Sequence, residues 1–265
     1  MGSKTKIDWA DATWNPVTGC LRGCEYCYAR RIAERFSAEE KCLTFVGDTK
    51  FLSPYELEQP AEYKGKKEPY PFGFSPTLHR YRLDEPKKWE KPRTIFVCSM
   101  ADLFGEWVPD AWIREVFEAC EAAPQHRYLF LTKNAKRYRK LQELLPLNRR
   151  SPHGAELWFG ASYTGEPNDL RPRIYGWMNQ FTSVEPLLKE PSNADCYALA
   201  LCNDWVIVGA ETGTRKNKIV PKKSWIEKSA TECAKYGTPI FMKESLRDLM
   251  GDGFRQEYPW RCEHE

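Results

Sequence analysis

The sequence predicts an α/β fold: a partial (β/α) barrel of about six to seven parallel strands in a single domain over residues 1–265. Short apolar runs recur from residue 93 onward, and they lack the polar alternation of half-exposed strands. Stretches with helical spacing separate them, such as Ile113, Val116 and Phe117. Repeated strand-then-helix order with right-handed crossovers indicates a parallel sheet that is either open or curled into a barrel.

Seven runs are expected to form the strands of this sheet. The first is expected around Trp9–Val17, although Pro16 is unfavourable inside a strand. The other six are short, apolar and rich in β-branched or aromatic residues: Thr94–Cys98, Tyr128–Leu131, Leu157–Ala161, Phe181–Val184, Trp205–Val208 and Pro239–Met242. Seven β/α units are fewer than a closed eightfold barrel needs.

Three helices beyond the one at Ile113 are expected from apolar spacing. One follows the first strand and carries Ala29, Ile32, Ala33 and Phe36 on one apolar face. The second has Tyr138, Leu141 and Leu145 on one face, and the third has Ile226, Ala230 and Cys233.

Residues 43–92 interrupt the alternation of strands and helices. They hold seven prolines among many aromatic and lysine residues: Pro54, Pro60, Pro69, Pro71, Pro76, Pro86 and Pro92. Long proline-rich stretches inside a compact domain are commonly functional loops. We therefore expect an irregular insertion that serves as a lid over a site.

Composition limits the class of protein. No run approaches the roughly 20 apolar residues that span a bilayer, and the N-terminus lacks the apolar core of a signal peptide, so a cytoplasmic protein without membrane contact is expected. The net charge of +3 indicates no polyanionic partner by itself, and the local lysine clusters are interpreted as solvated surface. The chain length and the irregular spacing of the ten cysteines argue against a disulfide scaffold.

Three cysteines form a tight group, Cys20, Cys24 and Cys27, in a C-x3-C-x2-C arrangement. Gly19 and Gly23 provide the backbone freedom that a loop around a metal centre needs. Thiolates bind both zinc and iron–sulfur clusters. A structural zinc site requires four protein ligands, and no fourth Cys or His lies nearby in sequence. A four-iron cluster held by three cysteines keeps one iron open to another ligand. Zinc and unliganded thiols remain alternatives.

The cysteine spacing, with Tyr26 before the last cysteine, resembles the cluster motif of the radical S-adenosylmethionine superfamily. The resemblance implies a 4Fe-4S cluster on the three cysteines, with S-adenosylmethionine bound to the open iron. It also implies a partial barrel whose cluster loop follows the first strand, where Cys20 falls. In such enzymes the reduced cluster cleaves S-adenosylmethionine into a 5′-deoxyadenosyl radical, which abstracts hydrogen from a substrate.

Polar residues follow the six later strands, where the reactive groups of parallel barrels gather. At any one strand the residue can simply cap the strand end. Taken together, they predict one polar mouth facing the cysteine loop. The residues concerned are Ser99, Asp102, Thr132, Lys133, Ser162, Tyr163, Glu185, Gly209, Glu211, Lys243 and Glu244.

Further stretches resemble an uncharacterised phage and bacterial family of radical-S-adenosylmethionine-like proteins over nearly the whole chain, from Lys4 to about Glu244: NPVTGC, LHRYRLDEPKKWEKP, CSMADLF, LTKNAKR, SVEPLL and WVIVGAETG. Many members have a longer gap between the first two cysteines, whereas this chain has the three-residue gap of authentic radical enzymes. The resemblance implies cofactor contacts by seven residues: Tyr26, Ser99, Asp102, Ser162, Val208, Gly209 and Glu211.

Lys133, Glu185 and Lys243 remain for catalysis or substrate binding, although a lysine at a strand end commonly pairs with a nearby carboxylate such as Glu185 or Glu211. The occurrence of the resembled family in phages favours a nucleotide or a modified DNA base as the substrate, with Trp, Tyr and basic residues of 43–92 for stacking and phosphate contact. The resemblance also implies a flavodoxin-like or ferredoxin-like electron donor. The alternative function is a non-catalytic barrel with a structural zinc or a redox-sensing iron–sulfur centre, acting through a partner or nucleic acid.

Overall fold

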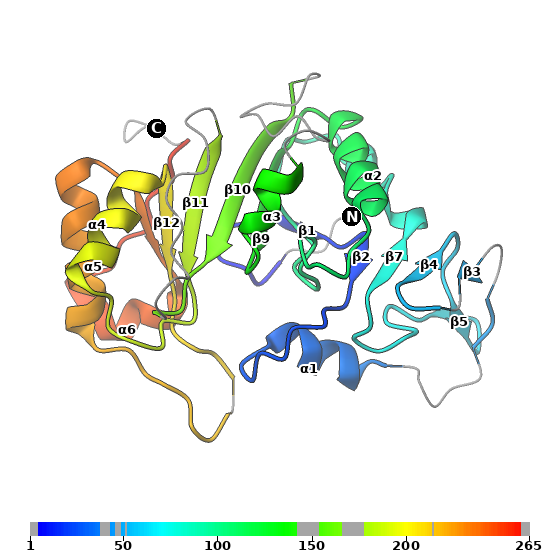
Figure 1. The fold of residues 1–265 in the computed structure, drawn as a ribbon, viewed down its shortest axis with the longest axis horizontal. Helices are drawn as coiled ribbons and strands as arrows, with labels where there is room; N and C mark the ends of the chain where they lie inside the picture. The colour runs from blue at the N-terminus through cyan, green and yellow to red at the C-terminus, as the bar shows by residue number, and fades with distance from the viewer. Residues whose placement is uncertain are drawn as a thin grey trace. The chain divides into compact units, whose positions relative to one another are not determined.

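The computed structural model describes residues 5–37, 43–45, 49–50, 52–141, 154–165, 178–213 and 215–260. Its main sheet has seven strands whose order, β1-β8-β9-β10-β11-β12-β13, follows the order of the chain (Figure 1). The strands are β1 (Ala12–Trp14), β8 (Thr94–Val97), β9 (Arg127–Thr132), β10 (Glu156–Ser162), β11 (Asn179–Val184), β12 (Trp205–Val208) and β13 (Ile240–Met242). A parallel sheet wound in chain order is the topology of a (β/α) barrel, so the predicted α/β partial barrel is confirmed.

The six later strands lie where the apolar runs predicted them, and only their ends differ. The first strand differs more. The run around Trp9–Val17 divides into β1 of the main sheet and β2 (Val17–Thr18) of a second sheet. Pro16 lies between the two strands and lacks the N–H that a continuous strand would use.

The chain divides into two compact units, and each is described by itself. The first comprises Met1–Thr5 and Ala10–Leu157, and the second comprises Lys6–Trp9 and Trp158–Glu265. The organisation as one functional domain remains a prediction.

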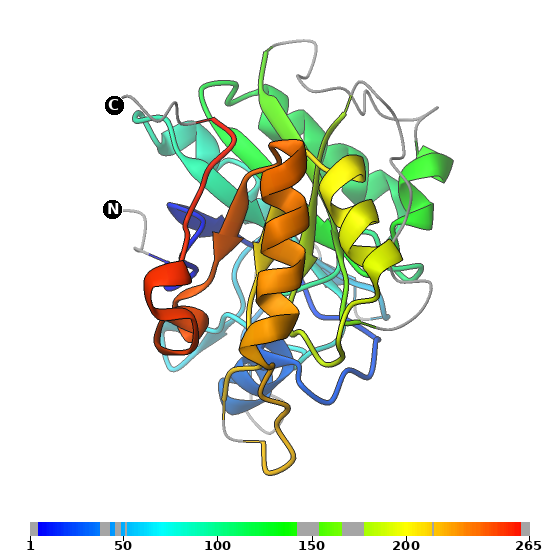
Figure 2. The same ribbon diagram turned by 90° about the vertical axis from the view of Figure 1, so that its left-hand side faces the viewer.

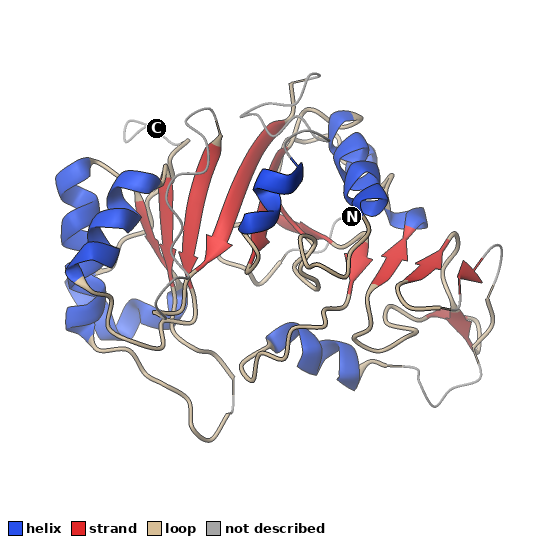
Figure 3. Ribbon diagram, in the orientation of Figure 1, coloured by secondary structure: helices blue, strands red, loops and turns tan. Residues whose placement is uncertain are grey.

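The first unit contains β1, β8 and β9 with the helices α1 (Tyr28–Arg35), α2 (Asp110–Glu121) and α3 (Lys136–Leu141). The 43–92 stretch contributes more regular structure than its prolines suggest (Figure 3). A four-stranded sheet has the order β2-β7-β4-β3, with β3 (Thr49–Lys50), β4 (Tyr55–Leu57) and β7 (Thr77–His79). A hairpin of β5 (Glu62–Tyr63) and β6 (Lys66–Lys67) accompanies it, and the turns η1 (Arg80–Arg82) and η2 (Pro86–Lys88) lead to β8.

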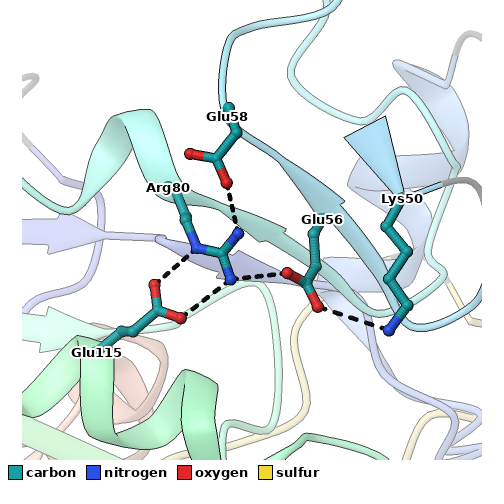
Figure 4. Close-up of polar contacts among 5 residues, drawn as sticks. All are labelled: Lys50, Glu56, Glu58, Arg80 and Glu115. Atoms are coloured by element: carbon teal, nitrogen blue, oxygen red, sulfur yellow. Dashed lines mark hydrogen bonds and ion pairs between the residues drawn. The ribbon is translucent and has the colours of Figure 1, made fainter. Parts of the chain in front are cut away.

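An arginine fastens this stretch to α2. The Arg80 guanidinium binds Glu115 of α2 through Nε at 2.9 Å, Glu58 through Nη1 at 2.5 Å and Glu56 through Nη2 at 2.7 Å (Figure 4). Lys50 adds a second cation 3.6 Å from Glu56. The planar fork of arginine suits several carboxylates at once, so this part of the expected lid is anchored within the first unit.

Aromatic side chains of the same stretch pack on one another. Tyr55 and Phe72 stack with ring centroids 3.9 Å apart, and Phe45 stacks on Phe72 at 5.7 Å. Stacking of aromatic rings stabilises a small apolar layer. These three rings therefore stabilise one another within the first unit.

Helix α1 corrects one prediction from helical spacing. Ala29 and Ala33 are buried, but Ile32 and Phe36, expected on the same apolar face, are 38% and 52% exposed. The two small residues allow the helix to approach the chain beneath it, and the larger residues lie on its outer side. The predicted partner of Tyr138 and Leu141 in α3, Leu145, lies outside the described residues.

The second unit contains most of β10 and all of β11, β12 and β13, with α4 (Asn193–Cys202), α5 (Lys223–Tyr236), η3 (Glu244–Leu246), α6 (Arg247–Met250) and η4 (Gly251–Gly253). Helices α4 and α5 lie side by side over one face of these strands (Figure 2). Leu199 of α4 and Ile226 of α5 pack with Val206 of β12 in one apolar cluster. Within the described parts of the chain, helices fall short of the length and apolarity required to cross a bilayer.

Candidate functional site

The cysteine loop is attached to its surroundings by main-chain hydrogen bonds. The Gly19 N–H donates to the Met100 carbonyl at 2.9 Å, and the Cys20 N–H donates to the Phe74 carbonyl at 3.0 Å. Gly19 has a φ of +87°, and a Cβ at this position would lie 2.2 Å from the Ser75 carbonyl oxygen. Only glycine fits this close approach of two backbones, and the start of the loop is therefore fixed within the first unit.

Two of the three thiols accept hydrogen bonds from main-chain N–H groups. Cys27 is the N-cap of α1, and its Sγ accepts from the Arg30 N–H at 3.4 Å. The Cys20 Sγ accepts from the Arg22 N–H at 3.4 Å, while the Cys27 N–H donates to the Cys24 carbonyl at 3.1 Å. An N–H donor and a helix N-terminus both stabilise a thiolate. These contacts suit thiolate ligands.

The three thiols differ in their exposure. Cys20 is buried, whereas Cys24 and Cys27 are partly exposed. Burial raises the pKa of the Cys20 thiol to about 11, although the Arg22 N–H acts in the opposite direction. Assembly of a metal centre on this loop therefore requires Cys20 to lose a proton, since the thiolate is the ligand. The described cysteines are all free thiols.

The donor set fits an iron–sulfur cluster. Such clusters are held by cysteine thiolates, and N–H bonds to sulfur adjust their potential; both features are present in this loop. Among the described residues, no three His, Cys, Asp or Glu side chains converge on the position of a single metal ion. A four-iron cluster distributes its ligands over separate iron atoms, so a three-thiol loop would not need such convergence to hold one.

Arg30 was not predicted from the sequence, and it ties α1 to the cysteine loop. Its Nη2 donates to the Cys20 carbonyl at 3.1 Å, and its guanidinium lies over the Phe74 ring, 4.9 Å from the centroid. Arg30 and Cys20 also border a pocket of about 290 Å³ together with Leu21, Glu34, Ser37, Gly73, Phe74 and Ser75. The only sequence signal for Arg30 is its place in the first turn after Cys27.

Asn15 positions the loop that follows β8. Its Oδ1 accepts from the Ser99 Oγ at 3.1 Å and from the Met100 N–H at 2.9 Å. Tyr28, at the start of α1, donates its hydroxyl proton to the Ser99 carbonyl at 2.7 Å. The structure thus brings Ser99 next to the cysteine loop. Sequence reasoning missed Asn15, although it follows the first strand directly in the NPVTGC stretch.

Asp102 connects the loop after β8 with the end of β9. This buried carboxylate accepts from the Thr132 Oγ1 at 2.6 Å, from the Lys133 N–H at 3.1 Å and from the Phe104 N–H at 3.2 Å. The Lys133 Nζ lies 5.4 Å from the centroid of the Tyr26 ring in the cysteine loop. Within the first unit, the structure thus links the ends of β8 and β9 to the cysteine loop, through Ser99 with Tyr28 and through Lys133 with Tyr26.

In the second unit, the ends of β11, β12 and β13 carry an ion pair over a glycine. The Lys243 Nζ lies 2.5 Å from the Glu185 Oε1, and the side chains are only 16% and 24% exposed. A Cβ on Gly209 would lie 2.9 Å from the Lys243 Cδ and 3.1 Å from the Glu185 Cδ. Glycine at this strand end leaves the space that the pair occupies. The pairing of a strand-end lysine with Glu185 matches the expectation from the sequence.

The remaining predicted residues of this unit lie on neighbouring strand ends. Val208 ends β12 and is buried, and Ser162 ends β10 opposite Ser183 of β11. Glu211 is buried, and its two oxygens accept from the Arg215 Nε at 2.7 Å and Nη2 at 2.8 Å. The Arg215 hydrogen bond lowers the pKa of this carboxyl, which keeps it anionic. Arg215 was not predicted as its partner.

These observations define the class of protein: a parallel α/β protein with a three-cysteine loop shortly after its first strand and polar residues at its strand ends. The chain belongs to the family DUF5131, described as "Protein of unknown function", whose model matches residues 4–247.

Comparison with curated proteins finds no match. Among solved structures, the chain is similar to spore photoproduct lyase complexed with dinucleoside spore photoproduct, at 11% identity and a TM-score of 0.45, covering 89% of this chain and 64% of the lyase. It therefore spans less than two thirds of that chain. A double mutant of the lyase with bound AdoMet and dinucleoside spore photoproduct is similar at 11% identity and a TM-score of 0.49, covering 97% of this chain and 79% of the other.

Proposed function

We propose that the chain is a radical S-adenosylmethionine enzyme in which Cys20, Cys24 and Cys27 hold a 4Fe-4S cluster. The observation that carries this proposal is the cysteine loop itself. Its C-x3-C-x2-C spacing is joined to the turn after β8 through Gly19, and Cys27 caps α1 with its thiol. When bound, the cluster and S-adenosylmethionine supply one-electron cleavage of the cofactor and hence a radical that abstracts hydrogen.

The chain's own residues bind and orient in this proposal. In the first unit, Asn15 fixes the loop of Ser99, and Tyr26 and Ser99 contact the cofactor. Asp102 already accepts three hydrogen bonds, and a carboxylate has about four acceptor positions. Contact with the cofactor amino group thus uses its remaining capacity. Ser162, Val208, Gly209 and Glu211 are proposed as the cofactor contacts contributed by the second unit.

The cofactor chemistry also requires an electron from outside the chain, and we propose a flavodoxin-like or ferredoxin-like protein as its donor. Two of the residues suggested for catalysis or substrate binding, Glu185 and Lys243, form an ion pair with each other. A ligand that contacts either residue must compensate for the bond it displaces.

A nucleotide or modified DNA base is proposed as the substrate. Support comes from two groups of exposed lysines in the 43–92 stretch: Lys64, Lys66, Lys67, Lys87, Lys88 and Lys91. Exposed lysines bind phosphate chiefly as point charges, and this attraction weakens as salt rises. The expected behaviour is binding to an oligonucleotide that declines between 50 and roughly 200 mM salt. Absence of binding at low salt contradicts the substrate proposal and leaves the cluster proposal intact.

The enzyme proposal is tested by anaerobic reconstitution with iron and sulfide. We expect a brown protein that bleaches with dithionite, binds S-adenosylmethionine and releases 5′-deoxyadenosine under reducing conditions. A colourless protein with stoichiometric zinc supports the non-catalytic alternative. A fully loaded cluster that yields no 5′-deoxyadenosine, with nucleotides and oligonucleotides present, contradicts the enzyme proposal.

A pair of cysteine variants provides the matched control. Cys24→Ala removes one proposed ligand, so we expect loss of the bleachable absorbance and of 5′-deoxyadenosine. Cys202→Ala changes another partly exposed thiol at the end of α4, and it should preserve both. Equal iron content in the two variants excludes Cys24 as a ligand.

A further inference from the structure

Lys133 is connected to the cysteine loop by its charge and to the end of β9 by its backbone. Its Nζ lies 5.4 Å from the centroid of Tyr26, within the roughly 6 Å range over which an ammonium is attracted to an aromatic face. Tyr26 is the residue between Cys24 and Cys27 that directly precedes the last thiol. The side chain of Lys133 thus connects the end of β9 with the cysteine loop. These two segments are about 100 residues apart in sequence, and only the tertiary fold brings them together.

The backbone around Lys133 is held from both sides. The Asp102 Oδ2 accepts from the Lys133 N–H at 3.1 Å. On either side, Thr132 donates its hydroxyl proton to Asp102 at 2.6 Å, and the Asn134 N–H donates to the Thr132 Oγ1 at 2.9 Å. Because the main chain is fixed, less conformational entropy is lost when the lysine side chain is held over the ring. Lys133 is also partly buried, which reduces screening of its charge by water.

The two charges near the loop act on different parts of it. The carboxylate of Asp102 is among the groups that act on Cys20, where burial is the largest effect and the charge adds to it. The ammonium of Lys133 lies over the ring of Tyr26, which stands between Cys24 and Cys27 in the sequence. A cation at this end of the loop offsets negative charge that accumulates on a group held by the thiols, and the reduced state of a cluster carries one negative charge more than the oxidised state.

We propose that Lys133 restrains the cysteine loop through its cation–π contact with Tyr26, a contact called the clasp below. We also propose that its positive charge favours the reduced state of the cluster held by the loop. The second half of this inference rests on the proposed function, whereas the clasp does not. Lys133 is a positioning residue in this role: it acts on the loop and on the charge beside it.

The clasp is tested in the metal-free protein by limited proteolysis with a glutamate-specific protease. Glu25 is exposed inside the cysteine loop, and none of the variants alters a glutamate. We expect several-fold faster cleavage after Glu25 in Lys133→Met and in Tyr26→Leu, with no further increase in the double variant. Lys136→Met makes the same change at an exposed position three residues away, and it should cleave like the unaltered chain. Equal cleavage in Lys133→Met and the unaltered chain overturns the proposal.

The charge is tested in the reconstituted protein by a redox titration followed by electron paramagnetic resonance. The midpoint potential should fall in Lys133→Met, stay near the original value in Lys133→Arg, and remain unchanged in Lys136→Met. An unchanged potential in fully loaded Lys133→Met overturns the electrostatic role. A chain that takes up no cluster refutes the proposed function instead, and the proteolysis experiment then decides the clasp by itself.

Discussion

The cysteine loop of the first unit and the strand ends of the second unit are held in different ways. Main-chain bonds and a glycine fix the cysteine loop: Gly19 donates to Met100 and leaves no room for a side chain. The strand ends are held by side-chain ion pairs, Lys243 with Glu185 and Arg215 with Glu211. Main-chain contacts leave the thiol side chains available as ligands, whereas an ion pair occupies the groups that it positions. The arrangement of the cysteine loop suits a group that stays bound to the thiols. The arrangement of the strand ends suits a ligand that replaces one member of an ion pair when it binds.

Gly19→Ala tests whether the main-chain contact fixes the cysteine loop, and it is expected to have the largest effect on stability. The new Cβ lies 2.2 Å from the Ser75 carbonyl oxygen at a φ of +87°, so the backbone must shift. We expect a loss of about 3 kcal/mol in unfolding free energy, from a strained backbone combined with overpacking, together with loss of iron uptake. Urea unfolding and iron analysis measure both. Gly23→Ala is the control, because a Cβ there meets no atom within 4 Å. Similar losses in the two variants would show that the contact with Ser75 is not decisive.

Asp102→Asn tests the link between the loop after β8 and the end of β9, because it removes the charge that accepts the hydrogen bonds between them. The amide keeps the shape but loses acceptor capacity for Thr132 and Lys133. We expect about 2 kcal/mol of destabilisation, the usual range for a hydrogen bond to a charged group, measured by urea unfolding. The control is Asp110→Asn, whose side chain is 52% exposed in its ion pair, and it should stay within about 0.5 kcal/mol. A loss confined to the control would contradict the assigned role of Asp102.

The ion pair of the second unit should show a smaller effect. We expect a coupling energy of about 1 kcal/mol between Glu185→Gln and Lys243→Met in a double-mutant cycle, because the pair is only partly screened by water. The exposed pair Lys223 and Glu227 in α5, 3.7 Å apart, should couple by about 0.3 kcal/mol as an ordinary helix-surface pair. Equal coupling in the two cycles would remove the distinction between the strand-end pair and a surface pair.

The smallest effect concerns pH and the strand β7 beside the cysteine loop. Burial keeps the pKa of His79 well below its usual 6.5, and its Nε2 lies 2.8 Å from the Thr18 hydroxyl oxygen. Below pH 6.5 the unfolded chain binds a proton that the folded chain does not, so stability is full above that pH and declines as pH falls. The expected loss at pH 6 is about 0.8 kcal/mol. Urea unfolding of the metal-free chain at pH 7.5 and 6 measures it, with His79→Gln as control. An equal decline in His79→Gln would assign the pH dependence to other groups.

Local sequence signals predicted the large features well, for identifiable reasons. Strands such as β12 are buried on both faces and therefore appear as uninterrupted apolar runs. The helical face of α1 was predicted only in part, because spacing alone does not distinguish the buried Ala33 from the exposed Phe36. For the site, the cysteine spacing indicated the ligands. No sequence pattern indicated Asn15 and Arg30, which position the loops around the cysteines. Asn15 contacts the loop after β8, and Arg30 contacts the loop before β7, so both depend on residues distant in sequence.

The sequence by itself determined that the main sheet is parallel, because periodicity and strand composition are local properties. The order of its strands, which follows the chain, comes from the tertiary structure. The sequence also determined which three thiols are grouped, since they lie within eight residues of one another. Only the tertiary structure decided that Gly19 must be glycine, that Asp102 holds the end of β9, and that Lys133 faces Tyr26. These contacts join residues far apart in the chain, and their geometry depends on packing between elements that no local pattern encodes.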